Sequence, residues 1–307
     1  MFDKPHIIND HLKISETRSV TVNYLEEHAE LYSSLAKTMW AYHEIGNLVP
    51  QTLDNMMSGH YFPYFESYYE LENSYQLVLE GFYTYAFTAL RSVLELGTLG
   101  VYFAIEDKEY EKVSPWIKSQ HPTPRFRDVL KNLYMLDNFK HFDEKFNFKT
   151  RVLLTYSHLS DFVHTRGYRF SSSGQTLSNF NRFSEGTLKE YSEVLISIVS
   201  QVIITILLKY PIGLQGLPLD EKFGLNPPAG GFLRPDQVDL IGSVIEKEEM
   251  EFLKRVSDSD PHVGKIVEHI TSLPDLSEED WHRQREEFDK RFPGLKIERG
   301  KMATEKE

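Results

Sequence analysis

The feature that most constrains the fold is a long apolar stretch near the middle of the chain. Residues 194–208 read VLISIVSQVIITILL and lie between Glu193 and Lys209. A membrane-spanning helix needs about 20 apolar residues, so this run of fifteen predicts a buried core helix. A second stretch, 82–105, has sufficient length but contains Arg91 and Glu95, and charges are costly inside a lipid bilayer. We therefore expect a helical core and no membrane partner.

Other apolar and aromatic residues recur at helical spacing in the first two thirds of the chain. The spacing predicts helices over 23–45, 61–79, 82–105, 125–136, 148–164 and 186–210. Short extended segments are expected only near residues 7–10 and 12–15, and no segment shows sustained strand alternation. Antiparallel helices with short links form bundles, so the fold is predicted to be all-α, with an up-and-down helical bundle.

The composition changes near Pro211. Of residues 1–212, 45 are charged, whereas 35 of the last 95 residues are charged. The intervening stretch is rich in Pro and Gly, which do not continue a helix. It is either a boundary loop or an ordered arm that packs on the bundle. The predicted organisation is a bundle domain at 1–212, a boundary loop at 213–234, a smaller charged helical segment at 235–293 and a disordered tail at 294–307. Within the charged segment, helices are predicted over 237–256, 262–271 and 281–292.

Several function classes are excluded by what the sequence lacks. The chain has no cysteine, which excludes disulfides, thiolate metal sites and a cysteine nucleophile. The first residues show no apolar leader, so a cytoplasmic location is expected. The net charge of −12 disfavours general binding to nucleic acids. No phosphate-binding loop, dinucleotide motif or metal-ligand spacing is found, so we expect neither a cofactor nor a metal.

The most informative polar residues lie in the predicted helix 148–164. Helical spacing places Arg151 and His158 on one face, and Asp161 and His164 on another. A guanidinium can neutralise a phosphate, an imidazole can transfer protons near neutral pH, and Asp161 can orient the ring of His164. The alternative is structural: Arg151 and His158 are solvated, and His164 caps the end of the helix.

The next segment, 162–184, contains arginines and aromatic residues but no acid. Arg166, Tyr168, Arg169 and Arg182 make it a candidate contact for RNA, through charge and base stacking. The alternative is a surface loop whose aromatic residues dock on the bundle. Arg91 and Glu95 are expected to support the core by pairing with each other or with a facing helix, for example 148–164.

The segment YSHLSDFVH at 156–164, preceded by ALRSVLE at 89–95, resembles bacterial helical families of unknown function and, more distantly, the HEPN superfamily. That superfamily carries an Arg followed at a short interval by a His, and here six residues separate Arg151 from His158. The resemblance implies a homodimer whose two Arg/His pairs line one cleft. It further implies a metal-independent ribonuclease of a toxin or antiviral system, which cleaves RNA through its 2′-hydroxyl.

A non-catalytic function fits the sequence as well. The charged C-terminal helices are predominantly acidic and offer a surface for a protein partner without any catalytic chemistry. The sequence therefore leaves two hypotheses open, a HEPN-like ribonuclease and a helical interaction or sensor module.

Overall fold

The computed structural model describes residues 11–49, 59–106, 111–176, 181–228 and 230–292. These residues form helices and connecting turns with no strand, which confirms the predicted all-α class. The tail at 294–307 and residues 7–10 lie outside the described residues. The predicted extended segment at 12–15 is wrong, because these residues belong to the first helix, His11–Glu27.

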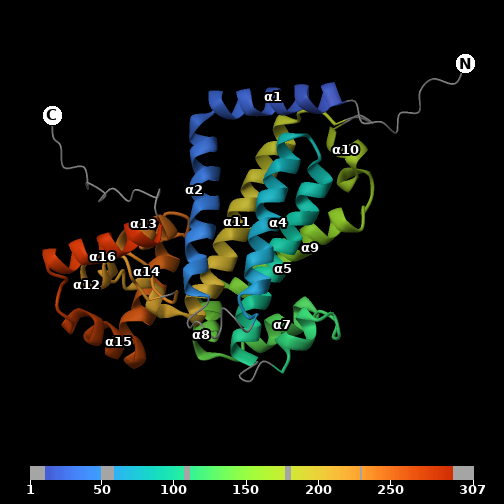
Figure 1. Ribbon diagram of the computed structural model, residues 1–307. Helices are drawn as coiled ribbons and strands as arrows, with labels where there is room; N and C mark the ends of the chain where they lie inside the picture. The colour runs from blue at the N-terminus through green and yellow to red at the C-terminus, as the bar shows by residue number, and fades with distance from the viewer. Residues whose placement is uncertain (1–10, 50–58, 107–110, 177–180, 229, 293–307) are drawn as a thin grey trace, which may run out of the picture.

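Five long helices make up the bundle (Figure 1). They are α2 (Ala29–Ile45), α4 (Phe62–Leu79), α5 (Tyr83–Glu106), α9 (Phe148–Val163) and α11 (Glu185–Lys209). Helix α11 contacts α2, α5 and α9, and α5 also contacts α4. A tight turn at Gly81, where φ is +78°, reverses the chain between α4 and α5. The bundle therefore has the expected up-and-down course.

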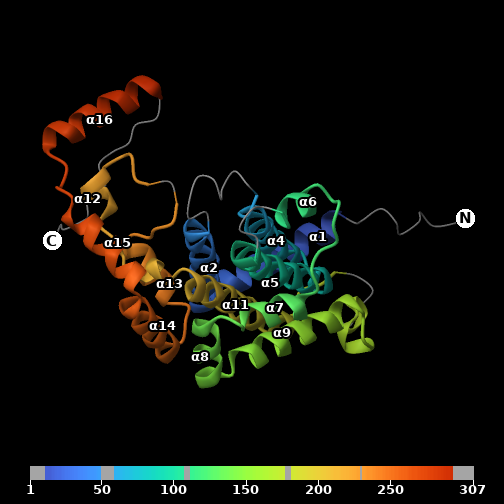
Figure 2. The same ribbon diagram turned by 90° about the horizontal axis from the view of Figure 1, so that it is seen from below.

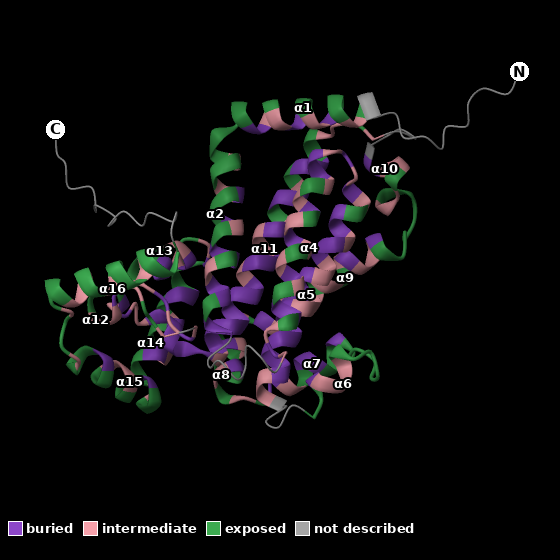
Figure 3. Ribbon diagram, viewed as in Figure 1, coloured by how far each residue is buried: buried purple, intermediate pink, exposed green. Residues whose placement is uncertain are grey.

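Helix α11 is deeply buried in the bundle (Figure 3). Every residue from Gln201 to Leu208 is buried, on all sides of the helix, because neighbouring helices surround this part of it. By length and composition, α5 and α11 could each cross a membrane, yet 61% and 72% of their most apolar windows are buried inside the protein. Burying each Leu, Ile or Val side chain contributes about 1.5–3 kcal/mol, so this helix is a major source of the stability of the fold.

The predicted helix at 23–45 is divided into two. Helix α1 (His11–Glu27) lies across one end of the bundle, and the chain turns at His28 into α2 (Figure 1). The His28 ring contacts the Tyr24 carbonyl at 2.7 Å and stacks on the Tyr24 ring. The sequence keeps its helical spacing through this corner, which explains why one helix was predicted.

Short helices close the opposite end of the bundle. They are η1 (Gly46–Leu48), α6 (Val113–Ile117), α7 (Phe126–Leu133) and α8 (Asp137–Phe146). Helix α8 was not predicted. It ends at Asn147, whose φ of 50° lies in the left-handed region, and α9 begins at the next residue. Asn is one of the few non-glycine residues that tolerate this conformation, which allows two helices to follow each other directly.

The C-terminal third is a series of short helices. They are η3 (Pro211–Leu214), α12 (Leu219–Phe223), α13 (Pro235–Gly242), α14 (Lys247–Ser259), α15 (Pro261–Ser272) and α16 (Glu278–Arg291). The helix predicted over 237–256 is interrupted between α13 and α14. The helix predicted over 281–292 begins three residues earlier, at Glu278, where Ser277 and Asp280 form a capping box.

The C-terminal third packs directly on the bundle. Leu233, Ile241 and Leu253 belong to the same hydrophobic core as the bundle helices. Ile212, Leu217, Leu219, Val263 and Ile270 form a second, smaller core. The 213–234 stretch contributes buried residues to both cores, as expected for an ordered arm that packs on the bundle. Helix α16 has no buried residue and is the outermost of these helices (Figure 2).

Candidate functional site

Arg151 lies in the first turn of α9 and forms an ion pair with Glu249 of α14. The Glu249 side chain is 5% exposed, and the guanidinium carbon of Arg151 also lies 5.3 Å from the centre of the Phe148 ring. Burial raises the pKa of Glu249, and the Arg151 charge opposes this shift. Arg151 therefore links the C-terminal helices to the bundle.

His158 belongs to a different group of charged residues. Its Nε2 lies 3.4 Å from Glu190 Oε1 on α11, and Arg169 Nη2 lies 3.5 Å from the same oxygen. The contact with His158 is the main reason why the pKa of Glu190 is lowered, with a further contribution from Arg169. The His158 ring also makes edge contacts with Phe87, among other rings. A carboxylate thus lies between an imidazole and a guanidinium.

The structure does not bring Arg151 and His158 together within one chain. They share a face of α9, but His158 lies seven positions after Arg151, which at about 1.5 Å per position separates them along the axis by about 10 Å. Their side chains contact acids from different helices, α14 for Arg151 and α11 for His158. Arg151 and His158 of one chain are therefore not placed to hold a single phosphate.

The expected contact between Asp161 and His164 is also not found. Asp161 Oδ1 instead accepts a hydrogen bond from Arg166 Nη1, at 3.3 Å. His164 is exposed at the end of α9, where its backbone N–H donates to the Ser160 carbonyl. Its position agrees with the structural alternative, a residue that ends the helix.

The basic loop after α9 is less positive than its sequence indicates. Arg166 pairs with Asp161 and Arg169 with Glu190, so acids outside the loop offset two of its three arginines. The loop folds into η2 (Tyr168–Phe170) and α10 (Ser172–Thr176), and Tyr168 remains 66% exposed. Arg182 is exposed and has no ion pair with any described residue. A single free arginine is a weak basis for an RNA interface.

Arg91 and Glu95 pair as the sequence predicts. Arg91 Nη2 lies 3.2 Å from Glu95 Oε1 and donates a hydrogen bond of 2.7 Å to the hydroxyl of Tyr156 on α9. The Tyr156 ring in turn stacks on Phe126, with ring centres 4.6 Å apart. The pair is half-buried and joins α5 to α9, which is a structural role.

A row of aromatic rings that was not predicted from the sequence is exposed on α2 and α4. We name these residues the aromatic strip: Trp40, His43, Phe65, Tyr68 and Tyr69. Successive rings lie 6.4 Å apart for Trp40 and His43, 5.4 Å for His43 and Tyr68, 6.4 Å for Tyr68 and Tyr69, and 4.7 Å for Tyr69 and Phe65. Trp40 is 63% exposed, Tyr69 46% and Phe65 39%. Contiguous exposed apolar surface of this kind marks interaction sites.

The strip forms because α4 carries more aromatic residues than its inner face can bury. Tyr64, Ser67 and Leu71 occupy the buried face of α4. Phe65 and Tyr69 are then directed outward, since they lie on the opposite side of a helix of 3.6 residues per turn. The signal in the sequence was an aromatic-rich helix with rings on every face.

The surroundings of the strip are acidic. Helix α4 contains Glu66, Glu70 and Glu72 but no Lys or Arg. The Tyr68 hydroxyl donates to Glu72 at 3.0 Å, and burial together with this carboxylate raises the pKa of Tyr68 to about 12. This surface therefore combines apolar rings with negative charge.

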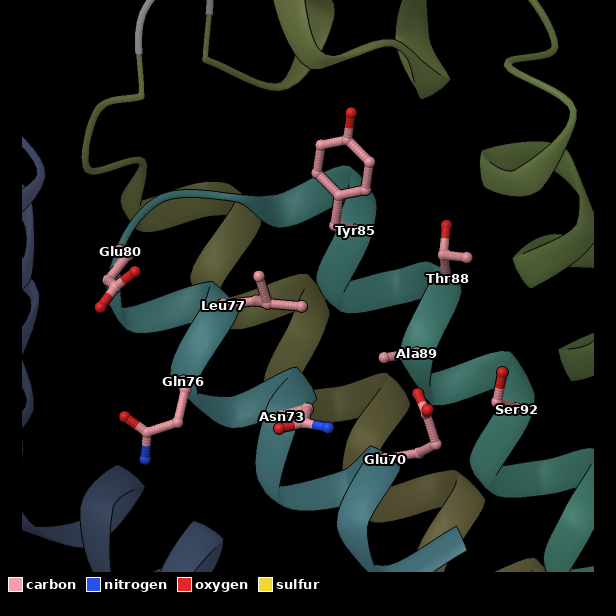
Figure 4. Close-up of a pocket in the computed structure, with 9 residues that line it drawn as sticks. All are labelled: Glu70, Asn73, Gln76, Leu77, Glu80, Tyr85, Thr88, Ala89 and Ser92. Atoms are coloured by element: carbon pink, nitrogen blue, oxygen red, sulfur yellow. The ribbon is translucent and has the colours of Figure 1, made fainter. Parts of the chain in front are cut away.

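A groove of about 440 Å³ lies between α5 and α4, the helix that also carries Phe65, Tyr68 and Tyr69 (Figure 4). Glu70 lines it from α4 and Glu80 from the turn after this helix, Leu77 lies between the two helices, and no Lys or Arg is part of the lining. Burial, and then the neighbouring Glu66, raises the pKa of Glu70. At the Glu80 end, Arg18 of α1 forms an ion pair at 3.2 Å. The groove extends the acidic surface across α4.

Within the described residues, no group of three or more His, Asp or Glu side chains is arranged to hold a metal. Comparison of the chain with protein-family models, with curated proteins and with solved structures finds no match.

Proposed function

We propose that this protein is a helical interaction module that binds a basic segment of a partner protein. The observation that carries the proposal is the aromatic strip, an exposed row of rings that shares α4 with an acidic groove. Trp and Tyr are the residues that most often dominate binding energy at protein interfaces. Carboxylates nearby favour Lys and Arg in the partner, and the faces of the rings attract the same cations.

The polar residues of α9 support this choice. Arg151 and His158 each contact an acid of another helix, so both have a structural explanation that needs no substrate. The net charge of −12 likewise favours a basic partner over RNA.

A peptide titration tests the proposal. The probe is a peptide of alternating lysine and leucine, added at physiological ionic strength and followed through Trp fluorescence, to which Trp40 contributes. Replacing Phe65 and Tyr69 together by alanine is expected to weaken binding by at least about tenfold, since truncating one central aromatic residue costs about 1–2 kcal/mol.

The matched control is Leu154→Ala, which truncates an apolar residue on α9 that is 65% exposed. It should bind the peptide as the wild type does, and a peptide of alternating glutamate and leucine should not bind. Equal weakening by the control and by the double variant would refute the assignment of the strip.

A second candidate is a HEPN-like, metal-independent ribonuclease of a toxin or antiviral system, formed by a homodimer. The specific observation in its favour is the contact of His158 with Glu190 and of Glu190 with Arg169. A carboxylate can orient an imidazole for proton transfer, and the nearby arginine could hold a phosphate if a bound RNA displaced it from Glu190.

Inducible expression with total-RNA profiling tests the second candidate. Wild type is compared with His158→Ala and Arg169→Ala, and Arg166→Ala serves as a control from the same loop. RNA cleavage that is lost only in the first two variants supports a ribonuclease. If no RNA is cleaved, or if all three variants cleave it, these residues are not a catalytic site.

A further inference from the structure

The groove between α4 and α5 contains a carboxylate without a counter-charge. Glu70 is half-buried, and in Figure 4 its carboxylate points from α4 towards Ala89 and Ser92 on α5. Its side chain forms no ion pair and no hydrogen bond with any described residue. Burial and then the neighbouring Glu66 raise the pKa of Glu70, so its charged form lacks a stabilisation that a bound cation would supply.

The basic residues on the helices around the groove are engaged elsewhere. Helices α4 and α5 contain one Lys or Arg between them, Arg91, which pairs with Glu95 on the same helix. Arg18 of α1 pairs with Glu80, which lies ten positions after Glu70 and so about 15 Å away along the direction of α4. Glu70 is therefore free to pair with a cation from outside the chain.

The groove also suits the rest of a long basic side chain. Leu77 and Ala89 line it with apolar surface, against which a methylene stem can pack. Asn73 and Ser92 add side-chain oxygens, and neither side chain forms a hydrogen bond with a described residue. A guanidinium has five N–H donors in one plane and can donate to a carboxylate and to further oxygens at the same time, whereas an ammonium has three donors and is more strongly hydrated. The lining therefore favours arginine over lysine.

The groove and the aromatic strip share α4. Tyr69 of the strip directly precedes Glu70, so the two side chains point about 100° apart around the axis of the helix. One partner segment can thus place apolar side chains on the strip and a basic side chain in the groove.

We propose that the groove binds an arginine side chain of the partner, with its guanidinium on the Glu70 carboxylate and its methylene stem against Leu77 and Ala89. This inference rests on the proposed function, and it adds which basic residue the partner contributes and where that residue binds. Other basic residues of the partner need only the general negative charge of this surface.

Titration of the full chain with two peptides of equal length tests this inference: the lysine–leucine peptide and its arginine–leucine counterpart. Wild type is expected to bind the arginine peptide at least about fivefold more tightly, because a guanidinium forms more hydrogen bonds in the groove. Glu70→Gln should weaken the arginine peptide at least about tenfold, as expected for the loss of a charge-assisted contact, and the lysine peptide at most about threefold.

Two further variants separate the groove from the overall charge. Ser92→Leu fills the groove and retains Glu70, so it should also remove the preference for arginine. Glu251→Gln removes one negative charge from an exposed position on α14 and should leave the preference unchanged.

The outcomes distinguish this inference from the proposed function. If both peptides bind but Glu70→Gln acts no more strongly than Glu251→Gln, or weakens both peptides equally, the groove does not select arginine, and the binding of a basic segment to the strip is unaffected. If neither peptide binds the wild type, the proposed function fails and this inference fails with it.

Discussion

Arg151 joins two parts of the molecule, and its contribution depends on how deeply its partner is buried. Glu249 is 5% exposed, whereas the Arg151 side chain is 41% exposed. Removing the arginine leaves a buried carboxylate without its counter-charge, which is far more costly than losing an exposed pair. Arg151, a candidate catalytic residue from the sequence, thus has a structural role.

Arg151→Met is expected to lower the free energy of unfolding by about 2 kcal/mol at neutral pH. The cost should fall as the pH is lowered. The pKa of Glu249 is raised in the folded state, so the folded protein binds a proton at this carboxyl more strongly than the unfolded chain does. At lower pH the carboxyl is protonated, and the variant no longer contains a buried charge without a partner. Urea unfolding at pH 4.5 and pH 7 measures both effects.

The control for this prediction is Arg166→Met. Arg166 pairs with Asp161 on the surface, and its side chain is 76% exposed. Exposed pairs contribute about 0–1 kcal/mol, so this variant should unfold almost as the wild type does at both pH values. A similar loss of stability in both variants would contradict the role given to Glu249.

Some features of individual residues could be predicted from the sequence and others could not. The pairing of Arg91 with Glu95 followed from their spacing on an apolar helix. The separation of Arg151 from His158 could not be predicted, because their acidic partners, Glu249 and Glu190, come from distant parts of the chain. Only the tertiary fold determines which acid each residue meets.

At the scale of helices, the approach of α5 to α11 depends on Gly97. A Cβ atom at this position would lie 2.7 Å from Val202 and 2.8 Å from the hydroxyl of Tyr42, closer than real side chains allow. Gly97→Ala is therefore expected to destabilise the protein by about 1–3 kcal/mol, because the buried helices must shift. Thermal unfolding provides the measurement.

Gly100, on the same helix, is the matched control for Gly97. A Cβ atom there would make ordinary contacts of 3.6 Å with Tyr64. Alanine is favoured over glycine in a helix by about 0.5–1 kcal/mol, so Gly100→Ala should be neutral or stabilising. If the two substitutions have equal effects, the packing of α5 against α11 is not as described.

The positions of the helices were predicted more reliably than which face of each helix is buried. The long helices followed from apolar spacing, but this spacing does not identify their buried faces: near the end of α9, Val163 is 38% exposed, whereas the neighbouring Phe162 is buried. On α4 the aromatic residues surround the helix, so spacing alone does not identify the exposed face. The corner at His28 and the break after Gly242 were missed because helical periodicity continues across both.

At the scale of the whole molecule, the C-terminal third is part of the folded core. Leu233, Ile241 and Leu253 fill the same core as the bundle helices. A chain that ends at residue 212 should therefore aggregate or lose cooperative unfolding, because it exposes the bundle surface that these residues cover.

The comparison for this truncation is a chain that ends at residue 272. It lacks α16, which has no buried residue, and keeps both hydrophobic cores. Its melting temperature should lie within about 5 °C of that of the full chain. A stable, cooperative fold of residues 1–212 would show that the bundle is an independent domain.

The molecule as a whole is a helical scaffold that presents an aromatic and acidic surface on α2 and α4. The most direct test places a photo-crosslinking benzoylphenylalanine at Tyr69, in the strip, or at Tyr168, in the basic loop, which are both exposed tyrosines. The lysine–leucine peptide is expected to crosslink at position 69 and not at position 168. Crosslinking at position 168 without crosslinking at position 69 would contradict the central claim.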